Sequence, residues 1–155
     1  MSDLLEIDNL TVQFRGDAGW ITAVDDVSLS LREGETLGIV GESGSGKSVT
    51  ALSVLRLHAA ATTRHPTGRI TYAGKDMLAL TPRQLRAVRG REIAMIFQDP
   101  MSSLNPVLTI ADQISETLRL HQDLDAAASR KRAIELLELV RIPDARRREI
   151  GRAHV

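Results

Sequence analysis

The segment that most constrains the fold of this chain runs from Gly41 to Ser48. It reads Gly-Glu-Ser-Gly-Ser-Gly-Lys-Ser, so that a glycine is followed, after four residues, by Gly-Lys-Ser. The apolar run Thr36–Val40 precedes it and predicts a buried strand, and Val49–Leu57 follows it and predicts a helix. A strand, a glycine-rich loop and a helix in this order predict an α/β fold with a P-loop.

The residue types of this loop suit the binding of phosphate. Glycines let the backbone turn its N–H groups inward, and the positive end of the following helix adds to the attraction for anions. We expect Lys47 to reach the terminal phosphates of a nucleotide and the Ser48 hydroxyl to ligate Mg²⁺. The alternative interpretation is a flexible glycine turn. The residues expected to contact the nucleotide are Gly41, Ser43, Gly44, Ser45, Gly46, Lys47, Ser48 and Val49.

Composition limits the class of protein. The 155 residues suffice for one ordinary domain, and 20 basic residues balance 20 acidic ones, so bulk charge gives no argument for a nucleic-acid partner. The absence of cysteine excludes disulfides and thiolate metal sites. No apolar run approaches the roughly 20 residues of a membrane span, and the N-terminus does not resemble a signal peptide. A soluble cytoplasmic module is the default expectation.

Strand patterns flank the P-loop on both sides. Leu4–Phe14 and Ala23–Leu31 alternate between apolar and polar residues, which predicts an antiparallel layer beside the nucleotide core. The parallel sheet itself is expected to start at Thr36. Arg69–Ala73, closed by Gly74-Lys75-Asp76, predicts one arm of a hairpin, and Glu92–Phe97 predicts another buried strand.

Three more helices are predicted from their N-caps, which are Thr81, Thr109 and Asp125. Pro82 suits the first helical position after Thr81, and Gln84 can close a capping box. Asp112 can do the same for Thr109, and the last helix is expected to span 126–141. The apolar face of the helix after Thr109 is expected to hold Ile110, Ile114 and Leu118. The apolar face of the last helix is expected to hold Ile134, Leu137 and Val140. The opposite, solvated face of the last helix carries Arg130, Lys131, Glu135 and Glu138.

A second motif lies about fifty residues beyond Lys47. The segment 96–106 reads Ile-Phe-Gln-Asp-Pro-Met-Ser-Ser-Leu-Asn-Pro and resembles the Q-loop of ATP-binding cassette (ABC) transporter ATPases. The sequence of this segment, together with the sequences of Gly41–Thr50 and Arg141–Asp144, resembles the oligopeptide and dipeptide importer branch of that family. The resemblance covers Leu4 to Arg148. It implies a P-loop NTPase core with an N-terminal antiparallel β layer and the start of a helical subdomain.

The resemblance implies further roles. Gln98 would lie near Mg²⁺ and the attacking water, and would act with Lys47 in ATP hydrolysis; in isolation it would be read only as a polar residue ending a strand. An aromatic side chain would stack on adenine, and we expect Phe14, with Trp20 as the alternative and a purely structural role for Phe14 left open. The scattered His58, His65 and His121 suggest no metal site and are interpreted as surface residues.

The implied partners follow from the same family. Two ATP-binding subunits or cassettes would dimerise around ATP, and two membrane permease subunits would contact the Q-loop region, so the protein would be peripheral at the cytoplasmic face of the membrane. No nucleic-acid partner is expected. The implied function is hydrolysis of ATP to energise peptide uptake. The alternatives are a non-transport ABC ATPase acting on ribosomes or DNA, and a fragment that binds nucleotide without catalysis.

Half of the family's pattern is missing from the sequence. The Leu-Ser-Gly-Gly-Gln signature, the Mg²⁺-contacting Asp, the catalytic Glu and the switch His do not occur. Residues 149–155 depart from the family and back-translate to GAG ATC GGA AGA GCA CAC GTC, which resembles a sequencing-library adapter. We therefore expect 1–148 to be the N-terminal part of an ABC domain (β layer, P-loop core and Q-loop to about 100, helical subdomain from about 101). The last seven residues are interpreted as a non-native tail, and the chain alone as inactive in hydrolysis.

Overall fold

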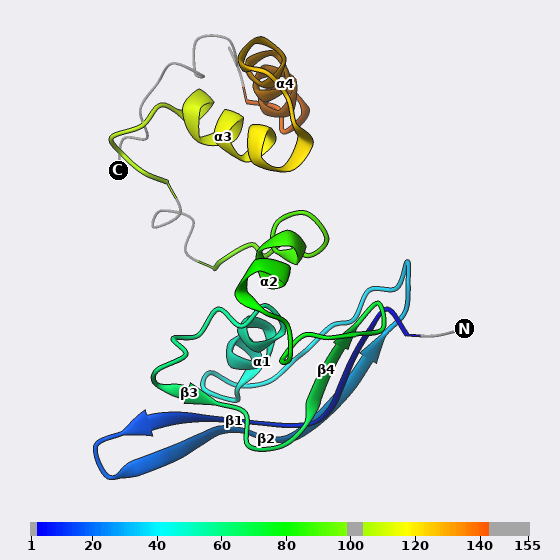
Figure 1. Cartoon of the computed structure of the whole chain (residues 1–155), viewed down its shortest axis with the longest axis vertical. Helices are drawn as coiled ribbons and strands as arrows, with labels where there is room; N and C mark the ends of the chain where they lie inside the picture. The colour runs from blue at the N-terminus through cyan, green and yellow to red at the C-terminus, as the bar shows by residue number, and fades with distance from the viewer. Residues whose placement is uncertain (1–2, 99–103, 143–155) are drawn as a thin grey trace. The chain divides into compact units, whose positions relative to one another are not determined.

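The computed structural model describes residues 3–98 and 104–142 of the chain. The chain divides into two compact units, Met1–Ile93 and Ala94–Val155 (Figure 1). The Q-loop residues 99–103, the approach to the expected signature at 143–148 and the proposed tail at 149–155 lie outside the described residues. Each of the two units has its own internal packing.

The first unit is built on a long β-hairpin. Strand β1 spans Leu5–Gly16 and pairs antiparallel with β2, Gly19–Leu31. Both strands are predicted from the alternating patterns, but the hairpin is longer than expected, because Phe14–Gly16 pair with Gly19–Ile21 and leave only a tight turn. Shifts of register follow Ile7, and there the Asn9 side-chain amide donates to the Asp26 carboxylate across 2.7 Å.

Three short strands complete an antiparallel sheet. Strand β4, Arg69–Tyr72, pairs with β1 on one side and with β5, Lys75–Asp76, on the other, which confirms the predicted hairpin arm. The order is β2-β1-β4-β5, and β3, Thr63–Arg64, pairs with the far end of β1. The expected antiparallel layer is thus confirmed, and it is the sheet on which the P-loop helix rests.

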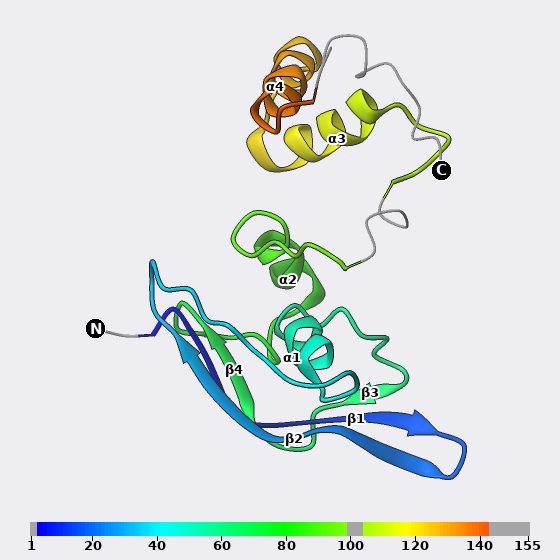
Figure 2. The ribbon, with the colours of Figure 1, turned by 180° about the vertical axis from the view of Figure 1, so that it is seen from behind.

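Two helices contribute side chains to the core of the first unit. Helix α1, Lys47–Val54, contacts β1 and β2, and both views of the ribbon show it over the sheet (Figures 1 and 2). Helix α2, Pro82–Val88, begins with the predicted capping box, in which Thr81 accepts from the Gln84 backbone N–H. The core between helices and sheet is apolar, and its fully buried side chains include Leu10, Val12, Ile70 and Met77.

The expected parallel strands are not formed, and this prediction was wrong for the described residues. Neither Thr36–Val40 nor Glu92–Phe97 is extended in a sheet; Ile93 makes only an isolated bridge to Arg89. Val40 is 97% exposed and Ile96 is 98% exposed. A strand exists only where a neighbour pairs with its backbone, and within the described part of the chain neither segment has such a neighbour.

The exposed apolar residues of these two segments predict how the chain associates in solution. Apolar side chains on unpaired extended backbone associate readily, so we expect the 155-residue chain to be unstable or to aggregate at high concentration. Size-exclusion chromatography over a range of concentrations measures this, and Val40→Lys with Ile96→Lys should shift the chain toward monomer. An unmodified chain that elutes as a monomer over the whole range of concentrations would contradict the expectation.

The second unit contains a helix pair. Helix α3, Ile110–Gln122, and helix α4, Ala126–Leu139, contact each other. Thr109 and Asp125 accept hydrogen bonds from the first turns as predicted. The buried side of α4 carries Ser129, Ala133 and Leu137. None of the helices in the described ranges is both long enough and apolar enough to cross a membrane.

The expected apolar stripe of α4 is only partly correct. Leu137 is buried as predicted, but Val140 is 65% exposed because the helix ends at Leu139 and Val140 is its C-cap. Two small residues, Ala133 and Ser129, are buried on α4 together with Leu137. A stripe drawn from large apolar residues alone misses such positions, since close packing of two helices favours small side chains.

Arg89, just after α2, fixes the end of the P-loop helix. Its guanidinium donates twice to the Leu55 carbonyl, at 2.9 and 2.6 Å, and once to the Arg56 carbonyl at 2.7 Å. These carbonyls end α1 and have no partner within the helix, and the cation also suits the negative end of the helix dipole.

We expect Arg89→Met to lower the free energy of unfolding by about 2–3 kcal/mol, because hydrogen bonds to a charged donor are lost and carbonyl groups at a half-buried helix end are left unpaired. Arg83→Met on α2 is the matched control, since Arg83 is exposed, and it should change stability by less than about 0.5 kcal/mol. Urea unfolding of both variants measures the difference, and equal midpoints would contradict the role of Arg89.

The histidines differ from the surface interpretation. His58, His65 and His121 are each half buried, and His58 Nε2 lies 3.1 Å from the Val49 carbonyl oxygen. The ring of His58 also meets Phe14 edge-on, with 5.0 Å between ring centroids. Burial, then the neighbouring His58 and Arg56, lower the pKa of His65 below its ordinary value of 6.5.

The lowered pKa predicts acid sensitivity. The folded chain binds a proton at His65 less readily than the unfolded chain, so stability is complete above about pH 6.5 and falls as the pH drops through the folded pKa. The ionisable side chains that line the same cavity as His65 are Arg56, His58, Arg86 and Arg89, and none of these is acidic. We expect His65→Asn to reduce this loss in unfolding measurements between about pH 5 and 8. An unchanged slope would show that other groups cause it.

Candidate functional site: the glycine-rich loop and the start of helix α1

The loop from Gly41 to Gly46 leads directly into α1. Gly44 and Gly46 adopt left-handed backbone angles, with φ of 83° and 86°. Gly46 is the N-cap, and no side chain caps the helix. The first turn contains no acidic residue either. The backbone N–H groups that open α1 are therefore left to an outside acceptor, which is the condition for binding an anion at a helix start.

Lys47 is folded back across the loop. Its Nζ donates to the carbonyl oxygens of Gly41 and Glu42, at 2.6 and 2.7 Å, and to Ser45 Oγ at 3.2 Å. An ammonium group has three donors, and here all three are used by the loop itself. The cation thus holds the loop closed and lies beside the free amides. A phosphate oxygen can replace one of these acceptors without Lys47 leaving the loop.

The loop is also held in place by its contacts with β2 and with α1. A Cβ on Gly46 would lie 2.9 Å from the Ala23 carbonyl oxygen and 3.2 Å from Val24 Cγ2, so the loop lies tightly on β2. Thr50 is buried, and both its backbone N–H and its hydroxyl donate to the Gly46 carbonyl, at 2.8 and 3.0 Å. Sequence reasoning gave Thr50 no role. Thr50 lies four residues after Gly46, and a threonine hydroxyl at that spacing can donate to the earlier backbone carbonyl. This spacing was the signal that could have identified Thr50.

The structure brings together the predicted phosphate contacts in 41–49 but not every predicted site residue. Ser48 is the second residue of α1 and is exposed. Gln98 is exposed too, and it belongs to the second unit whereas the P-loop belongs to the first. Both side chains offer neutral oxygen atoms, which are the type of donor that Mg²⁺ accepts.

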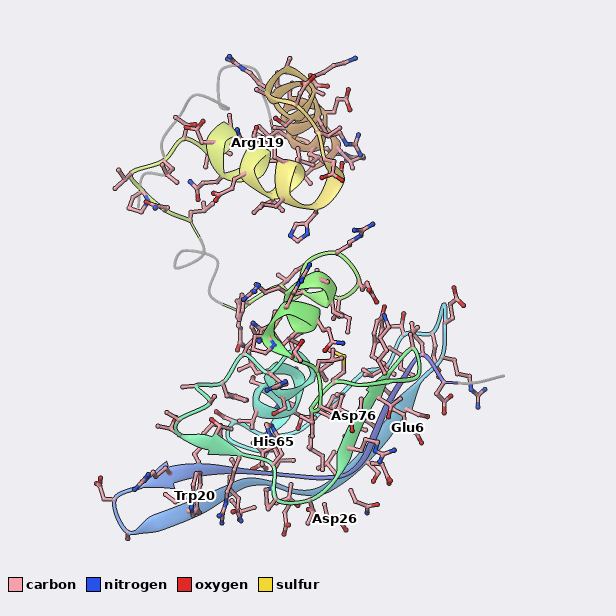
Figure 3. All side chains as sticks on the ribbon, in the orientation of Figure 1. Glu6, Trp20, Asp26, His65, Asp76 and Arg119 are labelled. Atoms are coloured by element: carbon pink, nitrogen blue, oxygen red, sulfur yellow. The ribbon has the colours of Figure 1, made fainter. Side chains whose placement is uncertain are left out.

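The two aromatic candidates lie in different settings. Phe14 is half buried, packs against the core and meets His58. Trp20, labelled in Figure 3 near the tip of the β1–β2 hairpin, is 39% exposed. The Arg64 guanidinium lies 4.3 Å from the centre of its ring. One face of Trp20 is therefore already occupied by a cation.

Comparison with known proteins assigns this loop to a family. The ABC transporter family profile matches residues 24–154, and the chain belongs to that family. A peptide import ATP-binding protein of Brucella abortus (strain 2308) is 61% identical over 145 residues, which is 94% of this chain and 43% of the relative. The oligopeptide transport ATP-binding protein OppD of Bacillus subtilis (strain 168) is 46% identical over 140 residues, 90% of this chain and 39% of OppD.

A solved structure shows the same fold. The ATP-binding cassette MJ0796, in a dimeric post-hydrolysis state bound to ADP and phosphate, matches with a TM-score of 0.81 at 24% identity. The match covers 96% of this chain and 61% of the cassette. The expected fold class, an ABC ATPase core with an antiparallel β layer, is confirmed. The chain spans less than half the length of the two relatives named above.

Proposed function

We propose that this chain is part of the ATP-binding subunit of an ABC importer, which uses ATP hydrolysis to energise peptide uptake. The observation that carries the proposal is the uncapped start of α1 beneath a glycine loop, with Lys47 held across it. Backbone amides with a lysine cation beside them favour the binding of a polyphosphate over the binding of a neutral ligand. Family membership and the names of the relatives support ATP as the nucleotide and peptides as the cargo.

The chain's own residues would bind and orient the phosphates. The loop amides donate to the phosphate oxygens, and Lys47 exchanges one loop contact for the terminal phosphate. Ser48 and Gln98 would hold Mg²⁺ with the nucleotide, and Gln98 would also orient the attacking water. Mg²⁺, when bound, neutralises charge on the phosphate oxygens. The predicted phosphate contacts are Gly41, Ser43, Gly44, Ser45, Gly46, Lys47, Ser48 and Val49.

Phe14 remains the proposed partner of adenine, and Trp20 the alternative. Both belong to the β1–β2 hairpin, and only a ring with a free face can stack on a purine. Because the chain contains one tryptophan, its fluorescence reports on Trp20 directly. Quenching by ATP that persists in Phe14→Ala favours Trp20, whereas ATP binding that is weakened by Phe14→Ala with unchanged tryptophan emission favours Phe14.

The proposed partners are a second ATP-binding subunit or cassette and two membrane permease subunits. The solved cassette MJ0796 is a dimer, which supports the first of these. Relatives named for peptide import support a position at the cytoplasmic face of the cell membrane, because an import ATPase must act on proteins within that membrane. The permeases would be contacted through the Q-loop region around Gln98.

Peptide uptake tests the proposed function. Membrane vesicles are prepared with the complete ATP-binding subunits that contain this chain and with their permeases, and ATP is supplied on the cytoplasmic side. We expect uptake of a labelled oligopeptide that stops when Lys47→Ala is introduced. ATP hydrolysis without any peptide dependence, in vesicles that retain the subunits, would contradict the transport assignment while leaving nucleotide binding intact.

A further inference from the structure

A cavity of about 340 Å³ lies in the first unit, at the end of α1 that is remote from the P-loop. Helix α1 has eight residues, so its two ends are separated by about 12 Å. The wall of the cavity is formed by the C-terminal end of α1, by β3 and by α2. The polar and charged lining residues are Arg56, His58, Thr63, His65, Arg86 and Arg89.

The ionisable side chains that are described in this cavity are all basic. Three arginines and two histidines line it, and none of the described lining residues is an aspartate or a glutamate. Arg56 donates to the Leu80 carbonyl at 2.7 Å, and Arg89 donates to the carbonyls at the end of α1. Within residues 3–98 and 104–142, no carboxylate forms an ion pair with these arginines. The helix end contributes about half a negative charge, which three guanidinium groups exceed several-fold.

Two polar atoms in the same wall lack a partner. Thr63 Oγ1 and His65 Nε2 are buried and make no hydrogen bond to any described residue. Buried donors of this kind are nearly always satisfied, by protein, water or a ligand. Burial, and then the neighbouring Arg56, lower the pKa of Arg89. Figure 3 labels His65 beside α1.

We propose that this cavity binds a small phosphate-bearing anion, at a site separate from the P-loop. Arginines present fixed forks of donors to phosphate oxygens, and a hydroxyl and an imidazole can complete such a site. The opening is framed by Arg86, which is exposed on α2 and makes no hydrogen bond within the described chain. A bound anion would neutralise the cations that gather at the end of α1.

The experiment uses the full chain with Lys47→Ala, so that the P-loop does not capture the probe. Inorganic pyrophosphate is added without Mg²⁺, and the imidazole signals of His58, His65 and His121 are followed by NMR. We expect saturable shifts of His58 and His65 and none of His121, which lies on α3. Thermal melting should move upward over the same range of pyrophosphate.

Two substitutions on α2 locate the binding. Arg86→Gln should weaken pyrophosphate binding about tenfold, as expected for one lost charge-assisted contact. Arg83→Gln removes an equal charge from the same helix outside the cavity and should leave the affinity nearly unchanged. Absence of shifts at His58 and His65, equal shifts at His121, or equal effects of the two substitutions would overturn the proposal. None of these results depends on ATP binding at the P-loop.

Discussion

Replacing Lys47 with alanine should lower the affinity of the chain for ATP about 100-fold. The lysine is the only cation that contacts the loop among the described residues, and its Nζ lies within 2.6–3.2 Å of three loop acceptors. One charge-assisted contact to a phosphate contributes about 3 kcal/mol in a favourable site, which corresponds to roughly two powers of ten. Equilibrium titration of the dilute chain with ATP measures the loss.

Lys131→Ala is the matched control for this substitution. Lys131 is exposed on α4, in the other unit, and removing it changes the net charge of the chain by the same amount. Long-range charge effects at physiological salt are screened within about 8 Å, so the affinity should stay within a factor of two of the original. Equal losses in the two variants would mean that net charge, and not the loop, attracts the nucleotide.

The second large effect is expected from Gly46→Ala. The backbone at Gly46 is left-handed, with φ of 86°, and the added Cβ would lie 2.9 Å from the backbone oxygen of Ala23. The backbone strain costs about 1–2 kcal/mol and the steric contact adds about 1–3 kcal/mol. The loop must move away from β2 to relieve both, and the amides at the start of α1 then lose their arrangement. We expect lower stability in urea and ATP binding reduced at least tenfold.

Gly44→Ala separates the two causes. Gly44 has nearly the same φ, 83°, but a Cβ added to it would have no atom within 4 Å. The substitution therefore carries the backbone strain alone, about 1–2 kcal/mol. Stability should fall less than in Gly46→Ala. If both alanine variants lose the same stability, the contact with β2 does not fix the loop.

The local elements were predictable because their signals are local. The Thr81 capping box, the Asp125 cap and the hairpin at Gly74 each depend on residues a few positions apart, and each occurs in the structure. The P-loop followed from spacing in the same way. The register shifts of β1 near Asn9 were not predictable, because a bulge depends on the facing strand rather than on the strand's own pattern.

The two expected strands that do not form share one physical cause. The runs at Thr36 and Glu92 have the composition of buried strands, and composition reports what a segment can bury but not whether a neighbour pairs with it. The partial burial of His65 likewise depends on segments distant in the sequence, because His65 lines a cavity together with residues of β3 and α2. Thr50 was overlooked because its hydroxyl acts on a backbone carbonyl, which the residue types alone do not display.

The most direct test of the phosphate-binding loop compares ATP with adenosine. Backbone amide signals of the chain are recorded by NMR during titration with each ligand. We predict that ATP moves the signals of Gly41–Val49 in a saturable way and that adenosine, which has the base but no phosphate, leaves them in place. Adenosine moving the same signals, or ATP moving none of them, would contradict the account of this loop as a phosphate site.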